Sequence, residues 1–299
     1  MASRLQKNIN YFFGWLSLVV CSFIVRLTPR KFLYAVAQTI GLLGYRLLST
    51  QRKIALENLD IAFGNSKSKE EKNRIARDSF CAMVKSGFEI LHIIDNPAQI
   101  TQWITFRDKD ILDKALSRGK GVILVSAHFG NFPLMLGRLS KEGYPTAAIM
   151  RPMRDVRTEK LFAKKRGTYG IMTVYSQPRK ACVEDSIRRL RKNELLFILL
   201  DQHFGTAGVF VDFFGRKAAT ATGPITLAQR TQAVILPCFI VRHQDNTHSI
   251  MFDQPFELTQ AATEDETIRV NIQALTTLIE SYICRYPSQW AWIHRRWKS

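Results

Sequence analysis

Short apolar runs alternate with segments of helical periodicity along the second half of the chain. Continuous apolar runs bounded by Gly, Pro or polar residues are typical of strands that are buried on both faces. The runs that predict strands are 121–127, 144–150, 171–175, 194–201, 234–242 and 248–258. The segments that predict helices are 131–143, 156–170, 178–193, 222–233 and 263–286. The alternation predicts an α/β fold with a mostly parallel central sheet flanked by helices.

The first third of the chain has a different pattern. Residues 8–25 carry no charge, and a run of roughly 17 to 25 apolar residues is long enough to span a membrane. Residues 32–45 are apolar but too short to span, which favours an interfacial or core helix. The pattern predicts an N-terminal hydrophobic anchor helix, with residues 1–48 as anchor and interfacial helix and 49–299 as one α/β domain. The alternative is that both stretches are ordinary buried helices.

Between the anchor and the strands, the sequence predicts a connector and one long helix. Residues 50–66 are mostly polar and are interpreted as a connector. Ser68 and Glu71 have the spacing of a capping box, so a helix is expected to begin there. Apolar residues then recur at helical spacing as far as residue 94, and Pro97 ends the pattern.

The charge balance points to an anionic partner. The formal net charge is +18, with basic clusters at 164–166, 188–192 and 294–298. Nucleic acid, an anionic membrane face and an acidic protein would all suit this balance. Trp290, Trp292 and Trp297 lie among the last basic residues, a pattern that suits a membrane interface or stacking on bases. No nucleic-acid-binding motif, metal-ligand spacing, Walker loop or GxGxxG is present, so nucleic acid, metal and cofactor are not expected.

His128 is the first candidate for chemistry. It directly follows the predicted strand 121–127 and directly precedes a predicted helix. Reactive groups gather at the carboxyl ends of strands in open α/β sheets, and a histidine there can act as a general base near neutral pH. The backbone N–H groups of Gly130 and Asn131, at the helix start, could hold an anion or a developing oxyanion. The alternative is a histidine that only caps or packs.

Several motifs occur in a specific order along the chain. They are "NLDIAF" at 58–63, "SAHFGNF" at 126–132, "MRP" at 150–152, "LLDQ" at 199–202, "GVFVDFFGRKAATATGP" at 208–224 and "PSQWAWIHRRWK" at 287–298. Together they resemble the late acyltransferase family of lipid A biosynthesis, the lauroyl and myristoyl acyltransferases, within the lysophospholipid acyltransferase-like superfamily. The resemblance covers roughly residues 50–299 together with the anchor.

The resemblance implies an O-acyltransferase at the bacterial inner membrane, with its catalytic domain facing the cytoplasm. The donor would be an acyl carrier protein thioester or acyl-CoA, and the acceptor a hydroxyl of a lipid A precursor or a related anionic glycolipid. His128 would be the general base, and the family places an acid five residues later to orient the imidazole. That fifth position is Pro133 in this chain.

Three explanations of Pro133 stay open. An acid from elsewhere orients His128; Asp201, at the end of the strand 194–201, is the first candidate, followed by Asp155 and Glu89. Otherwise His128 acts without a carboxylate at a lower rate. In the third case the chain has lost acyl transfer and is a membrane protein of the same fold that binds anionic lipid.

Four further residues are candidates for substrate binding. Arg151 follows the strand 144–150, and the resemblance suggests that it holds a phosphate or the acyl carbonyl. Phe213 and Phe214 would line an acyl channel or, equally, form a core pair. Arg216 could meet a phosphate. Arg151 could instead be an ordinary surface residue.

Overall fold

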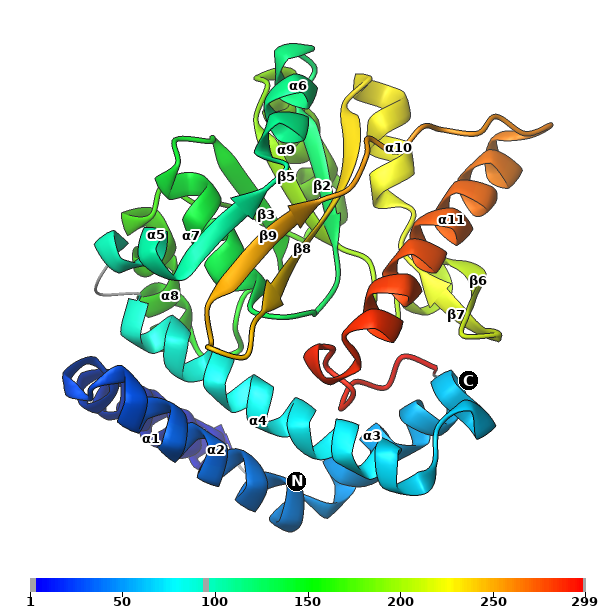
Figure 1. The fold of residues 1–299 in the computed structure, drawn as a ribbon. Helices are drawn as coiled ribbons and strands as arrows, with labels where there is room; N and C mark the ends of the chain where they lie inside the picture. The colour runs from blue at the N-terminus through cyan, green and yellow to red at the C-terminus, as the bar shows by residue number, and fades with distance from the viewer. Residues whose placement is uncertain (1–3, 94–96, 298–299) are drawn as a thin grey trace.

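A seven-stranded sheet forms the centre of the protein (Figure 1). The computed structural model describes residues 4–93 and 97–297, so Ile94, the expected end of one helix, and Lys298 of the last basic cluster lie outside the described residues. The strand order is β1-β9-β8-β2-β5-β3-β4, and a separate hairpin is formed by β6 and β7. The strands are β1 Ile104–Arg107, β2 Val122–Ser126, β3 Thr146–Met150, β4 Met172–Tyr175, β5 Leu195–Leu199, β6 Val209–Phe213, β7 Arg216–Thr220, β8 Val234–Arg242 and β9 His248–Phe252.

The predicted α/β fold with a mostly parallel sheet is confirmed. β8, β2, β5, β3 and β4 run in parallel, whereas β9 pairs with β8 in the antiparallel sense and β1 runs parallel to β9. The central strand β2 alternates between two cores: Val122 and Leu124 pack on one face, and Ile123 and Val125 on the other. This double burial explains why the strands are continuous apolar runs in the sequence.

Helices cover both faces of the sheet and one of its edges. The core on one face is completed by α5, α6 and α7, and the core on the other face by α3, α4, α9, α10 and α11. The helices are α1 Arg4–Leu27, α2 Arg30–Leu47, α3 Ser49–Phe63, α4 Lys69–Ile93, α5 Ile100–Trp103, α6 Lys109–Ser117, α7 Phe132–Lys141, α8 Val156–Thr168, α9 Arg179–Arg191, α10 Gly223–Thr231 and α11 Glu264–Arg285. The long helix α4 passes below the sheet in Figure 1 and separates it from α1 and α2.

The N-terminal helices present apolar side chains to the outside. Within α1, Asn8–Leu27 is 20 residues long with a mean hydropathy of 1.6, and it is the one helix of the described part that is long and apolar enough to cross a membrane. The helix α2 packs Leu33, Ala37 and Gly41 inward, and Gly41 lies against Cys81 of α4.

One local prediction is wrong. Residues 50–66 are no connector, because α3 fills most of that range and buries Ala55, Leu59 and Phe63 at helical spacing. Within the motif at 208–224, β6 and β7 form a regular hairpin. Its tight turn consists of Phe214 and Gly215, both with positive φ, as two-residue hairpin turns require.

Candidate active site

His128 and Asp201 lie side by side at the carboxyl edge of the parallel strands. β2 and β5 pair with Ser126 opposite Leu199, so His128 and Asp201 are both two residues beyond the paired strand ends. The Nδ1 atom of His128 lies 2.9 Å from Oδ1 of Asp201, and the backbone N–H of His128 donates to Oδ2 at 2.9 Å. The carboxylate therefore holds both the ring and the backbone of the histidine.

Asp201 is buried and ionised. Its side chain is 2% exposed, and its Oδ2 atom also accepts a hydrogen bond from Nε1 of Trp290 at 2.7 Å. Burial alone would raise the pKa of Asp201, but the charge of His128 and the hydrogen bonds from His128 and Trp290 lower this pKa to about 2. The carboxylate is thus a fixed negative charge behind the imidazole.

The imidazole of His128 keeps one nitrogen toward the open side of the site. Its side chain is 27% exposed, and the exposed side chain of Gln202 places Nε2 at 3.0 Å from Nε2 of His128. With Nδ1 donating to Asp201, Nε2 of the neutral ring is an acceptor, and the Gln202 amide donates to it. Burial lowers the pKa of His128, but the charge and hydrogen bond of Asp201 outweigh it, so the pKa is raised.

The other two acids considered for His128 are engaged elsewhere. Glu89 is paired with Arg242 and His248. Asp155 caps α8, where its Oδ2 accepts from the backbone N–H of Thr158 at 3.0 Å. Pro133 lies in the first turn of α7, a position where its fixed φ and missing N–H are tolerated.

The C-terminal segment supports the histidine loop, a contact that the sequence did not predict. Gly130 N–H donates to the carbonyl of Gln289 at 2.8 Å, and Ala291 N–H donates to the carbonyl of His128 at 3.1 Å. Asn58, within the "NLDIAF" motif, fixes the same segment by donating to the carbonyls of Trp292 and His294, each at 2.7 Å.

The expected interfacial role of the last tryptophans is wrong for two of them. Trp290 is 1% exposed and Trp292 is fully buried, because they belong to the core beside the hairpin β6–β7. Arg296 of the last basic cluster is also buried. It donates to the carbonyls of Gln202 at 2.9 Å and Ala219 at 2.7 Å. Burial lowers its pKa to about 10, although the nearby charge of Asp201 acts in the opposite direction.

The remaining predicted site residues divide into buried and exposed ones. Asn131 is buried and donates to Glu89 at 2.8 Å. Gly130 has φ +55°, and a Cβ there would lie 2.0 Å from the carbonyl oxygen of Ile240, so only glycine fits. Arg151, directly after β3, and Arg216, at the start of β7, are exposed.

Phe213 lies behind the His128–Asp201 pair. It is fully buried, and its ring centroid lies 5.7 Å from that of Trp290 and 4.9 Å from that of Phe214. In this position Phe213 packs against the tryptophan that holds Asp201, with no surface open to an acyl chain.

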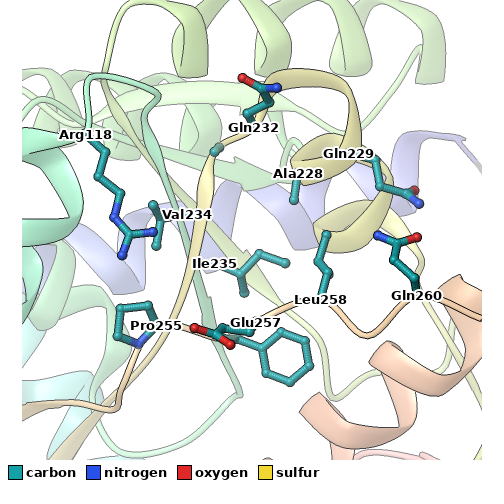
Figure 2. Close-up of a pocket in the computed structure, with 12 residues that line it drawn as sticks. Arg118, Ala228, Gln229, Gln232, Val234, Ile235, Pro255, Glu257, Leu258 and Gln260 are labelled. Carbon is teal, nitrogen blue, oxygen red and sulfur yellow. The ribbon is translucent and has the colours of Figure 1, made fainter.

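A cavity of about 460 Å³ lies at the opposite edge of the sheet (Figure 2). Its lining includes Arg118, Val234 and Glu257, and Val234 pairs with Val122 at the amino end of β2. The cavity is therefore separated from His128 by the length of the central strand. Among the described residues, no group of three His, Cys, Asp or Glu side chains could hold a metal ion.

The fold and the site define an α/β protein with a histidine–aspartate pair at the carboxyl edge of its sheet. This chain belongs to the bacterial lipid A biosynthesis acyltransferase family, whose profile matches residues 2–299. It is similar to the lipid A biosynthesis palmitoleoyltransferase of Escherichia coli (strain K12), with 26% identity over 99% of this chain and 94% of that protein. It is also similar to the lauroyltransferase of the same strain, at 24% identity over 97% and 92%.

A more distant similarity extends to another acceptor class. The phosphatidylinositol mannoside acyltransferase of Mycolicibacterium smegmatis (strain ATCC 700084 / mc(2)155) is 23% identical over 64% of this chain and 61% of that protein. All three relatives are named as acyltransferases. The family assignment makes this protein an O-acyltransferase with an acyl donor and a lipid acceptor.

Proposed function

We propose that this protein is a membrane-bound acyltransferase in which His128 acts as general base and Asp201 orients it. The acyl chain comes from an acyl carrier protein thioester or acyl-CoA, and the acceptor is a hydroxyl of a lipid A precursor or related glycolipid. One observation carries the proposal: Nδ1 of His128 lies 2.9 Å from a buried carboxylate, which leaves Nε2 as a proton acceptor on the open side.

In the proposed transfer, His128 only accepts a proton and later returns it. The acceptor hydroxyl takes the place of the Gln202 amide at Nε2 of His128. Nε2 accepts the hydroxyl proton as the oxygen attacks the thioester carbonyl carbon, and the C–O bond forms while the carbonyl π bond opens. The tetrahedral intermediate then collapses, the C–S bond breaks, and the imidazolium returns the proton to the departing thiolate. Asp201 stabilises the imidazolium and fixes the tautomer throughout.

The start of α7 offers a donor for the oxyanion of that intermediate. The N–H of Gly130 already donates to Gln289. In the part of the chain that the structure describes, no hydrogen bond uses the backbone N–H of Asn131 as donor, and this N–H lies at the positive end of the helix dipole. Asn131 is fully buried, so in our proposal it replaces Gly130 as the backbone donor only when this loop opens toward the substrate.

The partner surfaces follow from charge and apolar exposure. The net charge of +18 suits an acidic carrier protein, a phosphorylated acceptor and the anionic inner leaflet. Exposed Arg151 and Arg216 stay candidates for phosphate contacts. We place the domain in the cytoplasm, attached to the bacterial inner membrane through residues 1–48.

The proposal is tested by acyl transfer in vitro. Purified protein is incubated with an acyl carrier protein thioester and a lipid A precursor, and the acylated product is quantified by mass spectrometry. We expect His128→Ala to lower kcat by about 10²- to 10⁴-fold, because general-base catalysis contributes a factor of this size. The control is His243→Ala, since that ring contacts Ser249 near the β8–β9 turn.

Transfer that survives His128→Ala unchanged would remove His128 as the base. Negligible transfer by the wild type and both variants, with tight binding of the precursor, would favour the lipid-binding alternative. The position of Asp201 weakens that alternative, because Pro133 was the reason to consider it.

A further inference from the structure

A buried cluster around Glu89 connects α4 to four other segments of the chain. Glu89, on α4, is fully buried and accepts from Asn131 Nδ2 at 2.8 Å and from the hydroxyl of Tyr34 at 2.7 Å. Its carboxylate is paired with the guanidinium of Arg242 at the end of β8, and His248 Nε2 lies 3.3 Å away at the start of β9. Burial alone would raise the pKa of Glu89, but His248 and Arg242 lower it to about 2, so the carboxylate is ionised.

The cluster reaches the His128 loop by two routes. Asn131 is three residues beyond His128 and is the N-cap residue of α7, so its bond to Glu89 holds the end of the loop. Arg242 is the second route, because its backbone N–H and carbonyl both bond the side chain of Gln289, at 2.8 and 2.9 Å. The carbonyl of Gln289 in turn accepts from Gly130.

The same cluster reaches the outer helix α2 through Tyr34. The opposite face of α2 exposes apolar residues, among them Phe32, Val36 and Ile40. Arg30, at the start of α2, adds a second tie by donating to the carbonyl of Asn246 between β8 and β9 at 2.8 Å. A single ionised carboxylate thus lies between the membrane-facing helix and the loop that presents His128.

We propose that Glu89 is a positioning residue that couples the seating of α2 at the membrane to the geometry of the His128 loop. The inference rests on the proposed function, because it assigns the base to His128 and the membrane contact to α2. A buried carboxylate stays ionised because several donors bind it together. The loss of any one donor therefore affects the hydrogen bonds to the others. Movement of α2 away from α4 withdraws Tyr34 and weakens the hydrogen bond between Asn131 and Glu89.

The test compares two tyrosines of the same helix. Tyr34→Phe removes the hydroxyl that donates to Glu89. Tyr45→Phe is the matched control, because Tyr45 is also on α2 and also bonds α4, through Asn73 Oδ1 at 2.8 Å, away from Glu89. Amide hydrogen exchange at Gly130, Leu134 and Met135 reports the loop directly, since all three N–H groups donate within or from it. Exchange is measured with and without vesicles of phosphatidylethanolamine and phosphatidylglycerol.

We expect vesicles to slow exchange at these amides in the wild type. With vesicles, Tyr34→Phe should exchange about tenfold faster than the wild type, because a hydrogen bond to a charged group is lost. Tyr45→Phe should match the wild type. In the transfer assay Tyr34→Phe should lower kcat by a similar factor and leave KM unchanged, as expected when the base is misplaced and substrate binding is intact.

The coupling is overturned if Tyr34→Phe exchanges like the wild type, if both variants accelerate by the same factor, or if vesicles leave wild-type exchange unchanged. Cosedimentation with the vesicles measures membrane attachment separately. If the protein does not sediment with the vesicles, both the attachment and the coupling are wrong. Exchange does not depend on turnover, so a failure of His128 as base is distinguishable from a failure of the coupling.

Discussion

At the scale of single residues, the carboxylate beside His128 comes from the end of the neighbouring parallel strand and not from the histidine's own loop. Asp201 and His128 extend equally far beyond β5 and β2, so the carboxylate arrives at Nδ1 without any residue of α7. The proposal of Asp201 could be made from sequence because the ends of adjacent parallel strands meet at one edge. The bond from Trp290 could not, because it depends on the path of a segment 89 residues further along the chain.

Pro133 and Asp201 give a paired prediction about the orienting acid. We expect Pro133→Glu to bring no gain in kcat, because Nδ1 of His128 is already occupied by Asp201. Asp201→Asn should lower kcat by about 10⁴-fold, since the amide favours the wrong tautomer. Steady-state transfer assays on both variants check this. A clear gain in Pro133→Glu would mean that Asp201 does not orient the ring during turnover.

The raised pKa of His128 predicts the pH dependence of transfer. A general base must be unprotonated, so kcat/KM should rise with pH up to the pKa of His128, which lies above its ordinary value of 6.5. Asp201→Asn removes the negative charge that raises this pKa, and the acidic limb should therefore move to lower pH at a reduced maximum. Profiles from about pH 5 to about pH 9 cover the range in which a histidine titrates. If the acidic limb does not move in Asp201→Asn, the limb reports the titration of a group other than His128.

At the scale of elements, sequence prediction succeeded where burial is two-sided. The runs that form β2, β3, β5 and β8 are apolar except at strand ends, because helices cover both faces of the sheet. It failed for α3, because the many polar residues of this segment obscured the helical spacing of the buried Ala55, Leu59 and Phe63. It also failed for β1, whose four residues are too short for a periodic signal.

The crossing of α2 over α4 gives a prediction at this scale. A Cβ at Gly41 would lie 2.5 Å from the Cα of Cys81, whereas a Cβ at Gly44 would lie 3.7 Å from Phe80. Gly41→Ala should lower the free energy of unfolding by about 1–3 kcal/mol, because the helices must move apart. The control Gly44→Ala should raise it by about 0.5–1 kcal/mol, because alanine is the better helix former.

Urea denaturation followed by circular dichroism measures both free energies. Equal changes in the two variants would show that α2 does not pack on α4 through Gly41. By our inference from Glu89, Gly41→Ala should also speed exchange in the His128 loop, because the same displacement withdraws Tyr34.

At the scale of the whole molecule, the site and the apolar surface lie toward the same side. The helix α4 contacts the His128 loop through Glu89 and separates the sheet from α1 and α2 (Figure 1). In our proposal, an acceptor whose acyl chains remain in the bilayer would have a short path to His128, and a soluble donor would approach from the aqueous side. By the same proposal, exposed arginines near the strand ends, such as Arg151, would contact phosphates of the acceptor.

The exposed face of α1 supports a prediction about membrane attachment. Phe13 and Phe23 are 60% and 65% exposed, and insertion of a phenylalanine ring into an apolar phase contributes about 1.5–3 kcal/mol. The double variant Phe13→Glu/Phe23→Glu should bind phosphatidylglycerol-containing vesicles at least about 100-fold more weakly in cosedimentation. Phe210→Glu is the control, since Phe210 is 56% exposed on the hairpin β6–β7, across the molecule from α1 (Figure 1). If Phe210→Glu weakens binding as strongly as the double variant, the membrane contact is not made through α1, and the anchor assigned to residues 1–48 is wrong.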